Sequence, residues 1–361
     1  ILAVGSVQDV TAAIQGDYRK ADLQGAVMIP GLIDTHPHVM HFGTFNHTCT
    51  DLHDAVDHED IISRFAARAA TTPAGNWVMG SPIGEAHSHY CLERSYKDLK
   101  EGVLPDRYQL DKASDQHPIY LQAWAPVTPN VTAFNSLALQ ELGIDSQTPD
   151  RVGNVWIEKD EKGVPTGRLS GSVTNYYSNE PWWNELLCKV PLLDPTAILP
   201  GTLQAMNQFN ALGITTGYEG HAMDFPLIDA WGFIRESGQM TMRILCSPEA
   251  EPYGLPWTNP LSDEEFSTRL HTAKDLVSRE DDLFRIDGVT IGRGGPCGPG
   301  LLRMREPYKG PYGEMTSGVS FVSEERAKKA IDFCCDHSVR LNIVSAGNIE
   351  HDEYMDQIEA K

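Results

Sequence analysis

The sequence predicts a parallel α/β fold, and three features of the chain support this prediction. After residue 193, segments with helical and with strand-like patterns alternate regularly, which is typical of parallel α/β proteins. The run at residues 27–34 is apolar on both faces, as a strand buried in a parallel sheet should be. That run ends in His36-Pro37-His38, at the point where a strand gives way to a loop.

Composition and charge exclude several classes of protein. The 361 residues are 41% hydrophobic and 22% charged, an ordinary globular composition that can bury a sizeable core. The net charge of -21 argues against nucleic acid and against an anionic membrane surface, because both require a basic face. No stretch approaches the about eighteen consecutive apolar residues of a membrane span. We therefore expect a small-molecule substrate as partner, and a homo-oligomer is also compatible with the sequence.

The seven cysteines indicate the compartment. They are odd in number and lack the regular short spacings of a disulfide framework or a zinc ribbon. A reducing compartment explains this pattern most simply, so we expect a cytoplasmic protein. Residue 1 is isoleucine rather than methionine, so we expect the native N-terminus, with any targeting signal, to lie upstream.

Four regions follow one another along the chain. Residues 1–28 contain short apolar runs separated by glycines, which predicts strands and turns of a small β-domain. Residues 29–44 hold the first strand of the α/β domain and its two histidines. Residues 45–193 are less regular and are interpreted as a large insertion domain. Residues 194–361 carry the regular alternation of helices and strands.

The helices of the last region have recognisable starts. Asp194 and Pro195 predict a helix start, and Gly213 ends that helix before a strand at residues 214–218. Ser262 and Ser323, each followed by acidic residues, predict N-caps with acids at the positive end of the helix dipole. The same reasoning predicts further helices at 227–236 and around Ile61, Phe65 and Ala69, and strands at 119–124, 241–246, 284–291 and 341–344.

His36 and His38 are the first candidates for chemistry. Alternate residues on a strand point the same way, so both imidazoles are expected to converge on one spot at the carboxyl end of the first strand. Two convergent imidazoles are typical of a metal site, although two partly exposed loop histidines share the pattern.

The motif and its context resemble a known family. Residues 27–38, VMIPGLIDTHPH, resemble the opening motif of the amidohydrolase superfamily, and residues 22–25, DLQG, resemble the strand that leaves its β-sandwich. Further segments resemble the amidohydrolase-3 branch, which contains N-substituted formamide deformylases: residues 110–114, 117–121, 135–139, 163–167 and 212–216.

This resemblance implies a (β/α)8 TIM-barrel metal-dependent hydrolase fold with a small β-sandwich remnant at residues 1–28 and a large insertion domain. Counting residues 27–34 as the first strand, the chain supplies about five of the eight strands that a barrel requires. We therefore expect a partial barrel, incomplete at both ends, whose C-terminal strands are absent.

The resemblance also implies one or two divalent ions, usually zinc, that activate a water molecule. A bridging lysine or glutamate on the fourth strand, histidines on the fifth and sixth strands and an aspartate on the eighth are expected in the branch. The aspartate would lie beyond Lys361, so the catalytic residue is unknown. Where the branch has its lysine and its fifth-strand histidine, this chain has Thr290 and Val344, and its insertion-domain histidine corresponds to Asn130.

Because neither Thr290 nor Val344 can replace the lost ligands, other residues must be recruited. Glu219 and His221 follow the second strand at the same rim, although a solvated loop has the same pattern. If the chain binds a metal, we expect one ion rather than two, with zinc as the metal, bound by His36 and His38 with at least one of Glu219 and His221. Weaker candidates are packing or loop residues by the same criteria: Cys246, Cys297, His41, His47, His87 and His89.

Three functions remain open at this stage. The first is a metal-dependent hydrolase of carbon–nitrogen, non-peptide bonds in a small, partly apolar substrate. The second is a non-hydrolytic mononuclear metal enzyme, such as a lyase or isomerase. The third is a degenerate, non-catalytic member that binds a ligand. Tryptophans could line an apolar pocket, although they are more typical of a core: Trp77, Trp124, Trp182 and Trp183.

Overall fold

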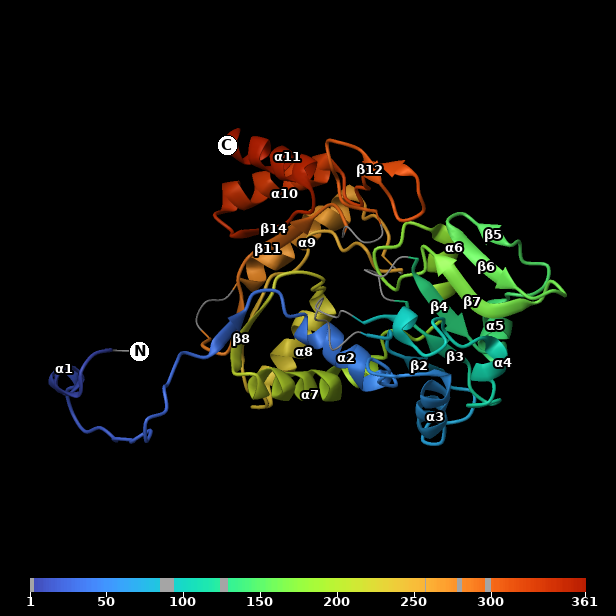
Figure 1. Cartoon of the computed structure of the whole chain (residues 1–361). Coiled ribbons are helices and arrows are strands. Elements are labelled where there is room, and N and C mark those ends of the chain that lie inside the picture. The colour runs from blue at the N-terminus through green and yellow to red at the C-terminus, as the bar shows by residue number, and fades with distance from the viewer. Residues whose placement is uncertain (1–2, 85–93, 124–128, 257, 278–280, 296–299) are drawn as a thin grey trace. The chain divides into compact units, whose positions relative to one another are not determined.

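The start of the chain contains a helix where the sequence predicted strands (Figure 1). The computed structural model describes residues 3–84, 94–123, 129–256, 258–277, 281–295 and 300–361. It divides the chain into two units, Ile1–Gly31 and Leu32–Lys361. In the first unit, helix α1 (Val7–Ala13) begins at Ser6, whose side chain forms a reciprocal capping box with Asp9. The prediction of strands within residues 1–28 is wrong here, because this local cap satisfies a helix start without any partner strand.

The apolar run at residues 27–34 contributes only a short edge strand. Strand β1 (Leu32–Asp34) pairs with β8 alone, at one end of its sheet. Ile33 is therefore 67% exposed, and Val27 is 86% exposed. The predicted burial of this run is wrong, because no described strand covers the free side of β1.

A parallel sheet brings the carboxyl ends of its strands to one edge. Its order is β1, β8 (Ile214–Glu219), β9 (Arg243–Cys246) and β10 (Phe284–Ile286). Asp34 is level with Gly217, and Glu219 is level with Cys246. The residues that follow β1 and β8 therefore meet at the same rim.

The predicted strand at residues 284–291 is in fact two strands in different sheets. After β10 the chain turns at Gly288, and β11 (Val289–Gly292) pairs in parallel with β14 (Leu341–Val344). Gly288 has φ of +118°, and a Cβ there would collide with the main-chain oxygen of Arg340. The glycine permits the break that strand periodicity alone could not show.

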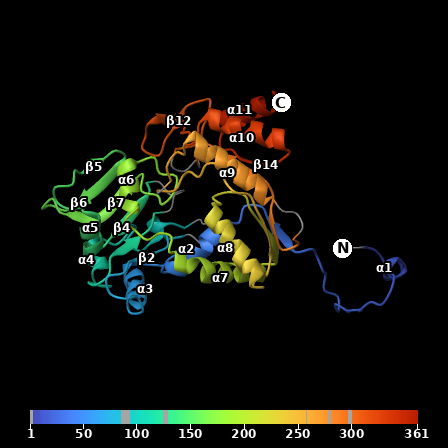
Figure 2. The ribbon, with the colours of Figure 1, turned by 180° about the vertical axis from the view of Figure 1, so that it is seen from behind.

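Figure 2 labels the helices of the α/β region, which begin close to the predicted residues. Asp194 caps a short 3₁₀ turn, Pro195–Ala197, that leads into α7 (Ile198–Ala211). Ser262 and Ser323 both cap helices through their side chains, as predicted. The remaining helices of this region are α2 (Val39–Thr48), α8 (Phe225–Glu236), α9 (Asp263–Leu276), α10 (Glu324–His337) and α11 (Asn348–Glu359).

The insertion has its own mixed sheet and cores. Its six strands have the order β2-β3-β4-β7-β6-β5, in which only β2 and β3 pair in parallel. Ile61, Phe65 and Ala69 lie on a helix, α3, as predicted, and their side chains are buried; Trp183 is a fully buried core residue. The elements are β2 (Val78–Gly80), β3 (Ile119–Leu121), β4 (Val131–Phe134), β5 (Arg151–Val152), β6 (Val155–Lys159), β7 (Pro165–Gly171), α3 (His58–Ala69), α4 (Arg107–Leu110), α5 (Ser136–Leu142), α6 (Pro181–Leu187) and the 3₁₀ turn Tyr96–Asp98. Outside it, β12 (Tyr308–Lys309) and β13 (Met315–Thr316) form a hairpin.

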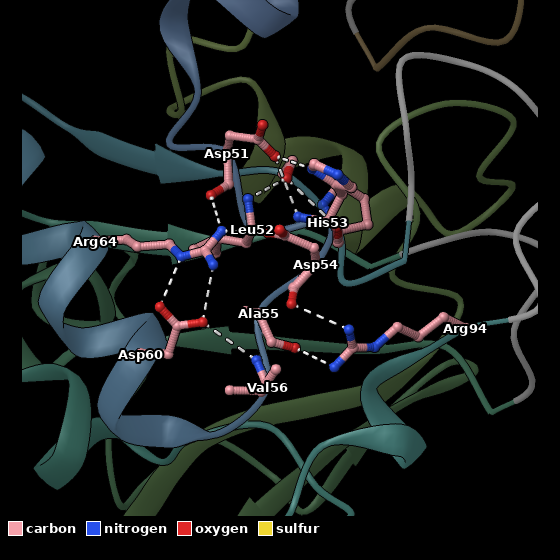
Figure 3. Close-up of polar contacts among 11 residues, drawn as sticks. Asp51, Leu52, His53, Asp54, Ala55, Val56, Asp60, Arg64 and Arg94 are labelled. Carbon is pink, nitrogen blue, oxygen red and sulfur yellow. Dashed lines mark hydrogen bonds and ion pairs between the residues drawn. The ribbon is translucent and has the colours of Figure 1, made fainter.

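Two arginines bind the loop that contains Asp54 and Ala55, near the start of the insertion (Figure 3). Arg64 of α3 donates hydrogen bonds to Asp60 at 2.8 Å and to Asp54 at 2.6 Å. Arg94 donates to the main-chain oxygens of Asp54 at 3.0 Å and of Ala55 at 2.6 Å. Because each guanidinium offers several donors in one plane, Arg64 holds this loop against α3 while Arg94 binds the main chain of the same loop.

The described strands do not close a barrel. The sheet β1-β8-β9-β10 and the pair β11-β14 are joined by one isolated parallel bridge between Glu249 and Thr290. The architecture is a mixed α/β fold with parallel strands in chain order. None of the described helices has the length and apolar character needed to cross a membrane.

Helices α2 and α7 cross at a pair of glycines. This crossing holds α2, the helix that begins directly after His38. A Cβ on Gly43 would lie 2.5 Å from the main-chain oxygen of Gly201, and a Cβ on Gly201 would meet the Gly43 backbone. By contrast, a Cβ on Gly232 of α8 would meet nothing within 4 Å. Only the first two glycines are therefore required by packing.

We predict that Gly201→Ala lowers the free energy of unfolding by about 1–3 kcal/mol, because backbone atoms cannot move aside as a flexible side chain does. Gly232→Ala should raise it by about 0.5–1 kcal/mol, since alanine favours a helix. Urea denaturation of both variants measures the difference. A Gly201→Ala protein as stable as Gly232→Ala would contradict the close crossing.

Candidate metal centre

His36 and His38 lie in the turn between β1 and α2. The main-chain N–H of His36 donates to Asp34 Oδ1 at 3.0 Å, which fixes the start of the turn. His38 has φ of +47° and occupies the N-cap position of α2. The two rings lie edge to face, with 4.7 Å between their centroids.

His221 brings a third imidazole to the same place from the end of β8. Its ring centroid lies 5.7 Å from that of His36 and 5.4 Å from that of His38. Two predictions meet here, since His36 and His38 were expected at one strand end and His221 at its neighbour. The structure brings the three rings into one cluster.

Glu219, the last residue of β8, is 1% exposed and faces the start of α2. Its Oε1 atom accepts a hydrogen bond of 2.6 Å from the Val39 N–H, while its Oε2 atom has no partner among the described residues. Burial raises the pKa of this carboxyl to about 7, against the smaller opposing effect of main-chain hydrogen bonds. Such an oxygen is a natural site for a cation.

Two residues that sequence reasoning did not single out hold His221. Glu249 Oε1 lies 2.8 Å from His221 Nδ1, and the Tyr177 hydroxyl hydrogen-bonds to His221 Nε2. Glu249 lies three residues beyond β9, so the strand-end argument that found Glu219 could have found it. No local sequence signal marks Tyr177, which has φ of +56° and comes from the insertion.

The electrostatics favour neutral imidazoles. Burial, and then the nearby His221, lowers the pKa of His36. Burial lowers the pKa of His38 well below its ordinary value, with added effects of His221, His41 and His36. A metal ion binds the neutral form of histidine, so these shifts prepare both side chains as ligands.

The donor set fits a divalent ion by its chemistry. It offers neutral imidazoles, a buried carboxyl oxygen of Glu219 that has no partner among the described residues, and a carboxylate, Glu249, that orients one imidazole through its other nitrogen. In the side-chain conformations of the described residues, no three His, Cys, Asp or Glu side chains form a complete metal-holding group. The Tyr177 hydroxyl contacts His221 Nε2, the nitrogen that a metal ion would need.

The other candidates are dispersed. His41 is buried, with its ring centroid 6.0 Å from that of His38, whereas His47 is exposed on α2. Cys246 is buried at the end of β9, and burial raises its thiol pKa well above the ordinary value, so it is an inert packing residue. His87, His89, Cys297 and Trp124 lie outside the described residues.

Thr290 and Val344 lie on paired strands, β11 and β14. Thr290 is fully buried, and its hydroxyl reaches the main chain between Glu219 and His221. Val344 is only partly buried. Asn342, level with Thr290 and not considered from sequence, also reaches that main chain.

The chain is thus a parallel α/β protein whose histidine cluster follows the carboxyl ends of adjacent strands. The chain belongs to the amidohydrolase family, whose family model matches residues 20–361. This confirms the family resemblance seen in the sequence.

Named relatives and solved structures agree with this assignment. The chain is 31% identical to YtcJ of Bacillus subtilis (strain 168), an amidohydrolase by name, over 93% of this chain and 56% of YtcJ. It is 28% identical to the N-substituted formamide deformylase of Arthrobacter pascens, over 50% of this chain and 31% of that enzyme. An uncharacterised metal-dependent hydrolase from Pyrococcus horikoshii OT3 has the same fold, with a TM-score of 0.59, 17% identity, and coverage of 92% of this chain and 56% of the other. The chain thus spans about a third to just over half the length of these relatives.

His41 provides a test of the buried electrostatics. Neither of its ring nitrogens has a hydrogen-bond partner among the described residues, and burial lowers its pKa to about 4. Because this folded-state pKa lies below that of the unfolded chain, the unfolded state takes up a proton first as the pH falls. The contribution of His41 to stability is thus present above about pH 6.5 and is lost as the pH falls toward 4.

We predict that His41→Leu removes this acid-sensitive contribution. Relative to the parent chain, the variant should gain roughly 2 kcal/mol of unfolding free energy between pH 7.5 and pH 5. Urea denaturation of metal-free protein at both pH values measures the gain. If the difference between variant and parent is the same at both pH values, His41 is not a buried neutral imidazole.

Proposed function

We propose that this chain is a metal-dependent hydrolase that cleaves a carbon–nitrogen, non-peptide bond of a small substrate. The proposal rests on the cluster formed by His36, His38 and His221 beside the buried carboxyl of Glu219. Family membership supports it, since relatives of this chain carry the names amidohydrolase and formamide deformylase.

The ligands that we propose are His36 and His38 with Glu219 and His221, around one divalent ion, with zinc as the candidate metal. When bound, such an ion lowers the pKa of a water molecule and polarises the oxygen of a carbonyl. Glu249 keeps the Nδ1 atom of His221 engaged, so the Nε2 atom, which the Tyr177 hydroxyl contacts in this structure, is the one that would bind the ion. The burial of Glu219 and His221 limits competing bulk water around the site.

A small cavity of about 30 Å³, which has room for about one water molecule, lies beside the cluster. Phe42 and Tyr176 line it, and their rings contact His38 and Tyr177 respectively. Among the described residues that line it, none carries a formal charge, and Gln122 adds an amide. A wider cavity in the insertion is lined partly by charged residues, Arg107 among them, and holds no member of the cluster.

We also propose that the parallel strands are part of a (β/α)8 barrel. The order β1-β8-β9-β10, with β11 and β14 following, is the order in which a barrel adds its strands. The cluster then lies at the carboxyl-end face, where barrels of this kind carry their sites.

The decisive experiment is His36→Ala, compared with His47→Ala. His47 is an exposed histidine in the last turn of α2, the helix that follows His36 and His38, so its replacement controls for the loss of an imidazole as such. We predict that the parent chain holds one divalent ion, and that His36→Ala loses both the ion and the hydrolysis of N-substituted formamides, while His47→Ala keeps both. Elemental analysis of the purified proteins and an assay of amine release measure the two effects.

Other outcomes contradict specific parts of the proposal. Two ions per chain in the parent protein would show that the reasoning from Thr290 and Val344 is mistaken. Unchanged metal content in His36→Ala would place the metal elsewhere. Tightly held metal without release of an amine would favour a non-hydrolytic metal enzyme.

A further inference from the structure

Thr290 makes side-chain contacts with the main chain of the candidate site. Its Oγ1 atom lies 2.7 Å from the carbonyl oxygen of Gly220 and 3.2 Å from that of Ser247. A hydroxyl has one hydrogen to donate, and the shorter distance assigns it to Gly220. Gly220 lies between Glu219 and His221, so this bond acts on the backbone that carries both side chains.

Asn342 completes the arrangement from the paired strand. Its Nδ2 atom donates to the same Gly220 oxygen at 2.5 Å and to Thr290 Oγ1 at 3.1 Å. An amide nitrogen has two hydrogens, so both bonds can form at once. The Gly220 carbonyl therefore accepts from two side chains that are level with each other on β11 and β14.

The main chain of Thr290 holds the other half of the site. Its N–H donates to the oxygen of Pro248 at 2.8 Å, and its oxygen accepts from the N–H of Ala250 at 2.8 Å. These two bonds flank Glu249, the carboxylate that contacts His221 Nδ1. One fully buried residue thus fixes both the loop that carries His221 and the loop that carries its partner.

The packing around Gly220 shows how little freedom this segment has. A Cβ on Gly220 would meet the ring of Tyr218 and would lie 2.9 Å from Asn342 Nδ2. The carbonyl oxygen of Gly220 is therefore held by hydrogen bonds, and its Cα atom is enclosed by neighbouring side chains.

We propose that Thr290 and Asn342 are positioning residues: together they fix the Gly220 carbonyl so that Glu219 and His221 face His36 and His38. Where the resemblance leads one to expect a metal-bridging lysine, this chain uses a hydroxyl that holds a ligand-bearing loop. The consequence for metal affinity rests on the proposed function, whereas the consequence for the loop does not.

The test compares Thr290→Val, which removes only the hydroxyl from a side chain of similar shape, with Thr290→Ser, which keeps it. Asn342→Leu is the second variant, since Asn342 is only partly buried and its replacement disturbs the core less. Hydrogen–deuterium exchange of the metal-free full chain should show residues 219–222 exchanging at least about tenfold faster in Thr290→Val and in Asn342→Leu. Thr290→Ser should exchange like the parent chain.

The second readout is metal binding, measured by competition with a chromophoric chelator for zinc and by the visible spectrum of the cobalt-loaded protein. Zinc affinity should fall by about 10- to 100-fold in Thr290→Val, with a changed cobalt spectrum, and Thr290→Ser should restore both. A purely structural loss of stability would not be expected to change ligand geometry and be rescued by serine.

The two readouts separate the two proposals. Unchanged exchange of residues 219–222 in both Thr290→Val and Asn342→Leu overturns the positioning role. If the parent chain binds metal, and Thr290→Val exchanges faster but has the zinc affinity and cobalt spectrum of the parent, the positioning role is also overturned. A parent chain that binds neither metal overturns the proposed function alone, and faster exchange in the two variants then still supports the positioning of the loop.

Discussion

The hydrogen bond from the Val39 N–H to Glu219 Oε1 joins the two halves of the candidate site, and the remaining geometry depends on it. The His38 side chain does not cap α2, although His38 occupies the N-cap position. The carboxyl of Glu219, distant in sequence, supplies an acceptor for the first turn of that helix at 2.6 Å. The same contact therefore anchors the start of α2, where His36 and His38 lie, to the end of β8, where His221 follows.

This arrangement has a free-energy cost that the surrounding structure must offset. Glu219 is buried with one oxygen unpartnered among the described residues, and its raised pKa expresses the cost of ionising it there. Backbone strain gathers at the same place, since His38, Tyr177 and Ala222 all have positive φ although none is glycine. The Gly43–Gly201 crossing and the bonds of Thr290 supply the rigid frame that keeps these conformations.

In our proposal, Thr290 and Asn342 organise the candidate site through the backbone, in a chain that belongs to the amidohydrolase family. Thr290 and Asn342 are level on adjacent strands, and both side chains contact the carbonyl oxygen of Gly220, which lies between Glu219 and His221. Tyr177, from the insertion, adds a phenol hydroxyl to a cluster whose histidines follow the ends of the parallel strands.

The sequence by itself determined the family, the capped helices and the strand-end positions of His36, His38, Glu219 and His221, because caps, glycines and side-chain alternation are local properties of the chain. It did not determine the break at Gly288 or the exposed edge strand β1, since each depends on which segments pair or cover one another. The helix at Val7–Ala13 was missed although its capping box, Ser6 with Asp9, is a local feature of the chain. The sequence also did not determine the roles of Glu249, Tyr177 and Asn342. Their roles arise from contacts between residues 28, 44 and 122 positions apart in the chain, and only tertiary structure decides which of many polar side chains meet across such separations.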